Sequence, residues 1–155
     1  MSTGKFDDSR SRGCRSGTAI LEFTFCAPLL ISLALGTLQF GYAFFVYGEL
    51  EQAVRAAGRY ASLRSYFSAT TTPDSAYLTA VRNVAVYGSP GGAAKPVASG
   101  LTTANVNVTV QFVNGVPATV GVAINDYRLP FFIGSVRLTR KPTVQFPYLG
   151  IYAPI

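Results

Sequence analysis

An almost uncharged apolar run near the N-terminus limits this chain to few folds. It reads TAILEFTFCAPLLISLALGTLQFGYAFFVYG from Thr18 to Gly48, and Glu22 is its only charged residue. A helix of roughly 20 apolar residues already spans the hydrocarbon core of a bilayer. Aromatic residues, which favour the membrane interface, lie near both ends of the run: Phe23, Phe25, Tyr42, Phe44, Phe45 and Tyr47. We therefore predict one transmembrane helix, with its span at about residues 23–47.

A secretory signal peptide is the first alternative, since basic residues precede the apolar run. The run is much longer than the roughly 7–15 residues of a signal-peptide core, and no small-x-small cleavage motif closes it. The helical pattern instead continues as ELEQAVRAAGRYASLR over residues 49–64, with Glu51, Arg55 and Arg59 at i,i+4 spacing. Apolar residues form a second stripe: Leu50, Ala53, Val54, Ala57 and Ala61. We predict a single helix over residues 18–67, with an amphipathic extension after the span.

The basic residues predict the orientation of the span. Four of them precede the apolar run: Lys5, Arg10, Arg12 and Arg15. Arg55, Arg59 and Arg64 follow it at greater distance, so the positive-inside rule favours a cytoplasmic N-terminus. Residues 1–17 are then a cytoplasmic leader, and residues 68–155 form an extracytoplasmic domain. The formal charge of +6 does not indicate a nucleic-acid partner, because the basic residues are scattered and are not clustered with stacking aromatics.

The residue types of the exported part argue against an enzyme. The sequence has no His, and its two cysteines, Cys14 and Cys26, lie in the leader and in the span. The acids beyond the membrane are few: Glu49, Glu51, Asp74 and Asp126. No carboxylate pair, His-containing triad or zinc site with nitrogen and sulfur ligands can be assembled from them, so we expect no catalysis, cofactor or metal. A Ser-Lys dyad that uses Lys95 or Lys141 stays open as the alternative.

The exported part has the pattern of a small α+β domain. Residues 77–87 (YLTAVRNVAVY) predict a short helix closed by Gly88, after a polar loop at residues 68–75. NVNVTVQF, residues 105–112, alternates between apolar and polar residues as a half-buried strand does. Asn114-Gly115 predicts a hairpin, and further strands are expected at residues 119–124, 136–139 and 143–146. The expected fold is α+β: a long N-terminal helix, then a domain with a short helix and a three- or four-stranded antiparallel sheet.

The position of Glu22, just inside the apolar run, requires an explanation. An ionised carboxylate at the centre of a membrane helix costs roughly 2.5–3.5 kcal/mol, less near the interface, and such residues usually face a partner. One interpretation is a glutamate that extends toward the interface. The other follows from Gly17, because a cut after this residue would give Thr18 a free ammonium group as a counter-ion for Glu22.

The N-terminal half resembles the TadE-like minor pseudopilins of the tight adherence (Flp, type IVb) pilus system, which are type IV pilin-like proteins. Five features carry the resemblance: RSG at 15–17, Thr18–Phe23 as a G/xxxxE[YF] processing site, the apolar run with Pro28, QFG at 39–41, and ELEQAVRAAGRYA at 49–61. The resemblance implies that an inner-membrane prepilin peptidase cuts between Gly17 and Thr18, with Glu22 at the fifth position of the mature chain. Phe23 stands where Tyr is commoner. Other pilin or pseudopilin subunits, the assembly machinery and membrane lipid are the implied partners.

Longer TadG-like proteins share such a helix, and some are thought not to be processed. An uncleaved, single-span envelope adaptor of that type is therefore the alternative function. The length of 155 residues and the well-formed Gly-x4-Glu site resemble the shorter, processed proteins. Major Flp pilins have little beyond the helix, so a domain of this size favours a minor subunit that takes part in pilus assembly, adhesion or secretion.

Four residues inside the apolar run are candidates for helix packing. Pro28 removes a backbone hydrogen bond, which loosens the helix for assembly or is simply tolerated in a membrane. Gly36 and Gly41 allow close approach of another helix, although their spacing is not GxxxG. Gln39 offers a hydrogen bond to a neighbouring helix, or to its own.

Overall fold

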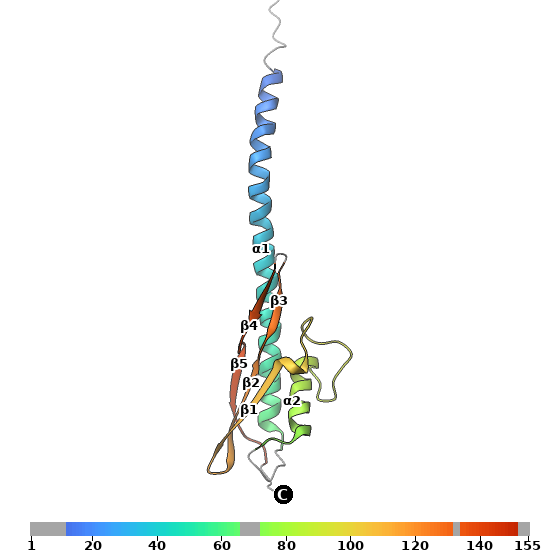
Figure 1. Cartoon of the computed structure of the whole chain (residues 1–155), viewed down its shortest axis with the longest axis vertical. Helices are drawn as coiled ribbons and strands as arrows, with labels where there is room; N and C mark the ends of the chain where they lie inside the picture. The colour runs from blue at the N-terminus through green and yellow to red at the C-terminus, as the bar shows by residue number, and fades with distance from the viewer. Residues whose placement is uncertain (1–11, 66–71, 132–133, 152–155) are drawn as a thin grey trace, which may run out of the picture. The chain divides into compact units, whose positions relative to one another are not determined.

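The computed structural model describes residues 12–65, 72–131 and 134–151, with side chains described from residue 17 onward. The chain divides into two compact units, Met1–Gly41 and Tyr42–Ile155. The helix α1 runs over Arg12–Leu63 and contributes to both (Figure 1). The long N-terminal helix that the sequence predicts is therefore present. Its predicted bounds of residues 18–67 differ from the structure, because α1 begins at Arg12 and ends at Leu63, and the described residues 64–65 are not helical. Residues 66–67 and most of the proposed leader lie outside the described residues.

The second unit is built on the amphipathic part of α1. Its predicted apolar stripe is buried: Leu50, Val54, Ala57 and Ala61 are 0% exposed and Ala53 is 6% exposed. Gly58 lies on the same side of the helix. A Cβ atom added there would lie 2.7 Å from Cδ2 of Phe146 and 3.0 Å from Cγ2 of Val144. The missing side chain thus allows the helix backbone to approach a strand closely.

The short helix α2, Ser75–Tyr87, begins two residues before the predicted start and ends where predicted. Gly88 adopts a left-handed conformation with φ of 72°, and its N–H donates to the carbonyl of Val84, which closes the helix. Its apolar face is buried: Tyr77, Ala80, Val81, Val84, Ala85 and Val86. A loop and a short 3-10 helix, η1 (Thr103–Asn105), lead from α2 to the strands.

The hairpin of β1, Val106–Val113, and β2, Val116–Ile124, confirms the predicted register. Asn114 and Gly115 both have positive φ, 53° and 78°, as a two-residue type I′ turn requires. The strands pair antiparallel, with Val106 opposite Ile124, Val108 opposite Val122 and Val110 opposite Val120. These valines and isoleucine form one core with buried residues of α1 and α2, so both helices cover the same face of the sheet (Figure 1).

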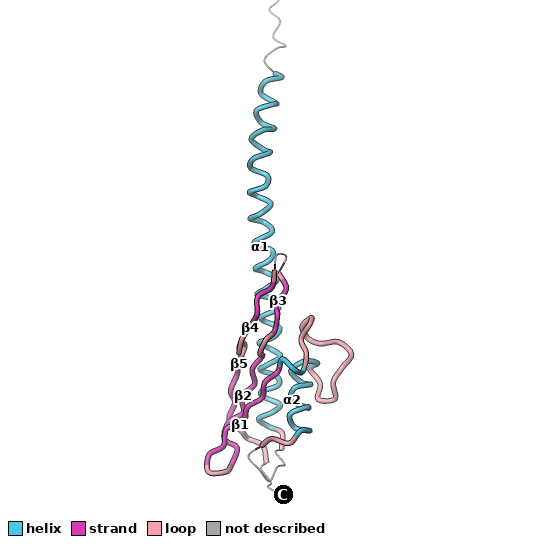
Figure 2. The backbone as a smooth tube through the Cα atoms, viewed as in Figure 1, coloured by secondary structure: helices cyan, strands magenta, loops and turns pink. Residues whose placement is uncertain are grey.

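The sequence predicts only part of the remaining three strands. β5, Thr143–Pro147, pairs with β2 and completes a sheet of order β1-β2-β5. β3, Tyr127–Pro130, and β4, Ser135–Leu138, form a separate two-stranded sheet (Figure 2). The sequence predicts β4 and β5 but not β3. The five strands are therefore divided between two sheets. Asp126, between β2 and β3, and Arg140, between β4 and β5, both have positive φ and lie where the chain passes from one sheet to the other.

The end of α1 is closed by residues that follow β5. The Tyr148 hydroxyl donates to the carbonyl of Arg64 at 2.9 Å, across 84 positions of sequence. The backbone N–H of Leu149 donates to the carbonyl of Ser62, also at 2.9 Å. Carbonyls of the last helical turn have no partner within their helix, so these two bonds supply partners from a distant segment.

Candidate functional site

The described part of the first unit is a helix, and its apolar side chains are exposed. The helical stretch Gly17–Leu63 is long and apolar enough to cross a membrane, and it is the one such helix among the residues that the structure describes. From Ile20 to Phe40 every large apolar side chain is exposed, between 48% for Leu35 and 78% for Phe25. Apolar side chains on all sides of a helix need an apolar surrounding, so this segment anchors the chain in a membrane.

Three hydroxyl groups within this segment form hydrogen bonds to their own helix. They donate to backbone carbonyls of the preceding turn, at 2.8, 2.8 and 3.0 Å: Thr24 to Ile20, Ser32 to Leu29, and Thr37 to Leu33. Hydrocarbon offers no partner for a hydroxyl, so such internal bonds lower the cost of placing these residues in a membrane.

The proposed processing residues lie on consecutive turns of α1. A Cβ atom added at Gly17 would have nothing within 4 Å, Glu22 is exposed, and Phe23 is 70% exposed. Thr18 and Glu22 are four positions apart, so their side chains lie on the same face of the helix. The structure therefore places the carboxylate one helical turn beyond the bond that follows Gly17.

The four proposed packing residues all lie within the same helix. Pro28 is inside α1, where its missing N–H leaves the carbonyl of Thr24 without its helical donor. Cβ atoms added at Gly36 and Gly41 would have nothing within 4 Å, and Gln39 is half-exposed. Their role in packing against another helix stays a prediction.

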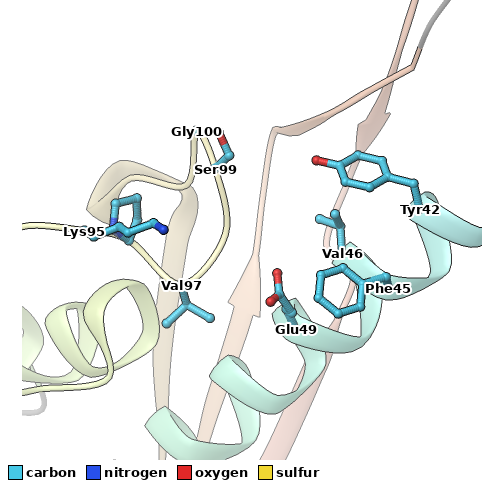
Figure 3. Close-up of a pocket in the computed structure, with 9 residues that line it drawn as sticks. Tyr42, Phe45, Val46, Glu49, Lys95, Val97, Ser99 and Gly100 are labelled. Atoms are coloured by element: carbon cyan, nitrogen blue, oxygen red, sulfur yellow. The ribbon is translucent and has the colours of Figure 1, made fainter.

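The second unit contains a pocket that the sequence analysis did not identify. It has a volume of about 420 Å³ and lies between α1 and the loop before η1 (Figure 3). Nine residues line it: Tyr42, Phe45, Val46, Glu49, Lys95, Pro96, Val97, Ser99 and Gly100. The sequence pattern gave no signal for it because the two walls are separated by more than forty residues.

The loop wall of this pocket is held by Tyr127 of β3. The hydroxyl of Tyr127 donates to the carbonyl of Ser99 at 2.8 Å. Burial raises the pKa of Tyr127 above its ordinary value of 10.0, and the neighbouring Tyr42 and Glu49 raise this pKa further. Tyr127 is therefore a neutral hydrogen-bond donor at physiological pH.

Candidate catalytic groups are not brought together in the described parts of the chain. No group of three or more His, Cys, Asp or Glu residues lies close enough there to hold a metal ion. Lys95 and Ser99 line the same pocket, but no hydrogen bond joins their side chains in the described structure. Asp126 forms an ion pair with Arg137 at 2.8 Å, and Glu51 pairs with Arg55.

Comparison with known proteins identifies the N-terminal segment. The model of the TadE-like protein family matches residues 17–59, which begin at the proposed processing glycine and extend into the buried part of α1. No curated protein and no solved structure matches the chain. The family match confirms, over these residues, the resemblance to TadE-like proteins found in the sequence. Residues 17–59 are thus a TadE-like segment, carried on an α+β protein with a membrane-anchoring helix.

Proposed function

We propose that this chain is a non-enzymatic minor pseudopilin of a tight adherence pilus. The observation that carries the proposal is the TadE-like match over residues 17–59, which covers the exposed apolar helix and starts at Gly17. In the proposed sequence of events, the chain enters the bacterial inner membrane with its N-terminus in the cytoplasm. A prepilin peptidase then cuts after Gly17, and the trimmed helix packs among other pilin or pseudopilin subunits.

Cleavage requires local opening of α1. The bond between Gly17 and Thr18 lies inside the helix, which begins at Arg12. Gly13 and Gly17 each lower helix stability by about 1 kcal/mol relative to alanine. Unwinding of the terminal turns therefore requires little free energy. The missing side chain of Gly17 would also let the backbone lie close against the peptidase.

The role proposed for Glu22 follows from its position after trimming. Thr18 would carry the new ammonium group, and Glu22 would lie one turn further along the helix. A carboxylate in the first turn interacts favourably with the positive end of the helix dipole. In an apolar surrounding it also needs a cation, which the ammonium of its own or of a neighbouring chain would supply.

The exposed helix supports assembly as well as anchoring. Side chains such as Phe25, Leu29 and Phe40 are 78%, 71% and 63% exposed, so they are free to contact lipid first and neighbouring helices later. Pro28, Gly36 and Gly41 would ease close packing in the fibre. The domain from residue 68 onward would then contact partner subunits outside the membrane.

An uncleaved envelope adaptor of the TadG-like type is the alternative function. It would share the anchoring helix and the exported domain, and would differ in keeping its leader. The decisive experiment is N-terminal sequencing of the protein extracted from membranes of the native host. The proposal requires a chain that begins at Thr18, and a chain that keeps residues 1–17 would favour the adaptor.

A glycine variant adds a test of the cleavage site itself. Gly17→Leu should leave the full-length species in the inner membrane, because a large side chain would prevent close contact with the peptidase. Gly36→Leu is the matched control, since an added Cβ at either glycine has nothing within 4 Å. Unchanged trimming of Gly17→Leu would contradict the assigned site.

A further inference from the structure

The pocket of the second unit has the chemistry of a binding site for a small charged group. Its α1 wall contributes aromatic and apolar side chains together with Glu49, and its loop wall contributes Lys95 and Ser99. The volume of about 420 Å³ falls in the range of ligand sites. Figure 3 shows the carboxylate of Glu49 and the ammonium of Lys95 directed toward the same open space.

The two opposite charges do not neutralise each other. Neither Glu49 nor Lys95 forms an ion pair or hydrogen bond through its side chain with any residue in the described ranges, whereas Glu51 and Asp126 do. Glu49 is half-buried, so its carboxylate is partly removed from water without a compensating partner. An occupant that carries both a cationic and an anionic group would supply an opposite charge for Glu49 on one wall and for Lys95 on the other.

Aromatic groups extend the recognition surface on the α1 wall. Phe45 is 62% exposed and Tyr42 is 48% exposed, although both belong to the pocket lining. An ammonium group is attracted to the face of an aromatic ring as well as to a carboxylate. Val97 on the loop wall is 40% exposed and offers an apolar contact to the uncharged part of an occupant.

The position of the pocket along α1 indicates where the occupant comes from. The lining residues of α1 run from Tyr42 to Glu49, which corresponds to about 10 Å of helix. They coincide with the aromatic cluster that ends the apolar run, and such clusters lie at the level of lipid headgroups. Headgroup layers are several Å thick on each side of the hydrocarbon core.

We propose that this pocket binds the headgroup of a zwitterionic phospholipid with a primary ammonium, the phosphoethanolamine class. The ammonium contacts the carboxylate of Glu49 and the Tyr42 ring, and the phosphate contacts the ammonium of Lys95. The inference rests on the membrane anchoring that is part of the proposed function. An anionic lipid without an ammonium group would satisfy Lys95 alone and would be repelled by Glu49.

The site also has a means of holding its shape. Ala98 and Leu101 are 1% and 3% exposed, so the loop is anchored in the core on both sides of Ser99. The hydrogen bond from Tyr127 to the Ser99 carbonyl fixes the loop between these anchors. A rigid loop keeps Lys95 opposite α1 and lowers the entropy lost on binding.

The test measures lipid binding to the full-length protein in nonionic detergent by native mass spectrometry. Dihexanoyl phosphatidylethanolamine and dihexanoyl phosphatidylglycerol are the probes. We expect the first to bind about fivefold more tightly than the second, the preference that one partly exposed ion pair supplies. Glu49→Gln should abolish this preference, and Lys95→Gln should weaken binding of both lipids.

Matched controls use the same substitutions outside the pocket. Glu51→Gln lies on the same helix and Lys141→Gln replaces another exposed lysine, and neither position lines the pocket. Both variants should retain the preference for the ethanolamine lipid. Equal binding of the two lipids by the unchanged protein, or the same loss in Glu51→Gln as in Glu49→Gln, would overturn the proposal.

A soluble probe separates a lipid from a free metabolite. Glycerophosphoethanolamine has the same charged groups without acyl chains, and we expect it to bind much more weakly than the lipid. Equal affinity would assign the pocket to a soluble ligand and overturn the lipid assignment. The measurement does not require cleavage after Gly17, so failure of the pilin proposal would leave the lipid preference intact, and loss of the preference would leave trimming intact.

Discussion

Gly58 offers a direct measure of how closely α1 approaches the sheet. A Cβ atom at this position would lie 2.7 and 2.9 Å from two ring carbons of Phe146 and 3.0 Å from Val144. Gly58→Ala gains about 0.5–1 kcal/mol of helix stability from the lower backbone entropy of the unfolded chain. Overpacking of a close contact costs about 1–3 kcal/mol. We therefore expect a net loss of about 1 kcal/mol in the free energy of unfolding.

Gly48→Ala is the matched control for this substitution. Gly48 lies ten positions earlier in α1, and a Cβ atom there would meet nothing within 4 Å. This variant should keep the helical gain without the contact, so the two variants should differ by about 1–3 kcal/mol. Pulse proteolysis in urea on the full-length protein in detergent measures both values. Equal stabilisation of both variants would refute the close helix-to-strand contact.

Three further predictions address the sheet, the buried tyrosine and the membrane carboxylate. Val108→Asp places a charge on the core face of β1 and should lower the free energy of unfolding by about 2–3 kcal/mol, while Thr109→Asp on the exposed face should be nearly neutral; equal protease sensitivity of the two would disprove the register. The folded-state pKa of Tyr127 is raised above 10.0, so the unfolded chain releases this proton at lower pH and stability should fall as pH rises above about 10. Tyr127→Phe should reduce that fall in urea titrations between about pH 9 and 11, and an unchanged slope would count against the burial of this hydroxyl. Glu22→Gln should be trimmed normally but absent from sheared pili, because loss of one member of a buried charge pair costs roughly 3–5 kcal/mol; its recovery in fibres at normal levels would show that no such pair forms.

The sequence was sufficient wherever a local pattern determines the structure. The alternation at Val106, Val108 and Val110 predicts which face of β1 is buried, and Asn114-Gly115 predicts the turn that sets its register. These features depend on residues that are close neighbours in the chain. The same holds for the buried stripe of α1, because its helical period is visible in the sequence itself.

Features that depend on distant residues were missed. β3 is only four residues long, follows the positive-φ residue Asp126 and ends at Pro130, so it contains no alternating run long enough to predict a strand. The pocket requires Lys95 to lie opposite Glu49, and this follows from the burial of Ala98 and Leu101 against a core that forms only in the folded domain. The sequence shows the type of each residue but not this juxtaposition.

The bonds from Tyr148 and Leu149 to the end of α1 impose an order of events on biogenesis. In the topology proposed above, the helix would enter the membrane early in synthesis. The carbonyls of Ser62 and Arg64 would receive these partners only after 84 or more further residues had been translated and moved across the membrane. The domain after the helix would then be unable to reach its final structure while the translocation channel still held the segment around Tyr148. Release from the channel and completion of the domain would be coupled in that topology, so a stalled or truncated chain would be left with an open helix end accessible to envelope proteases.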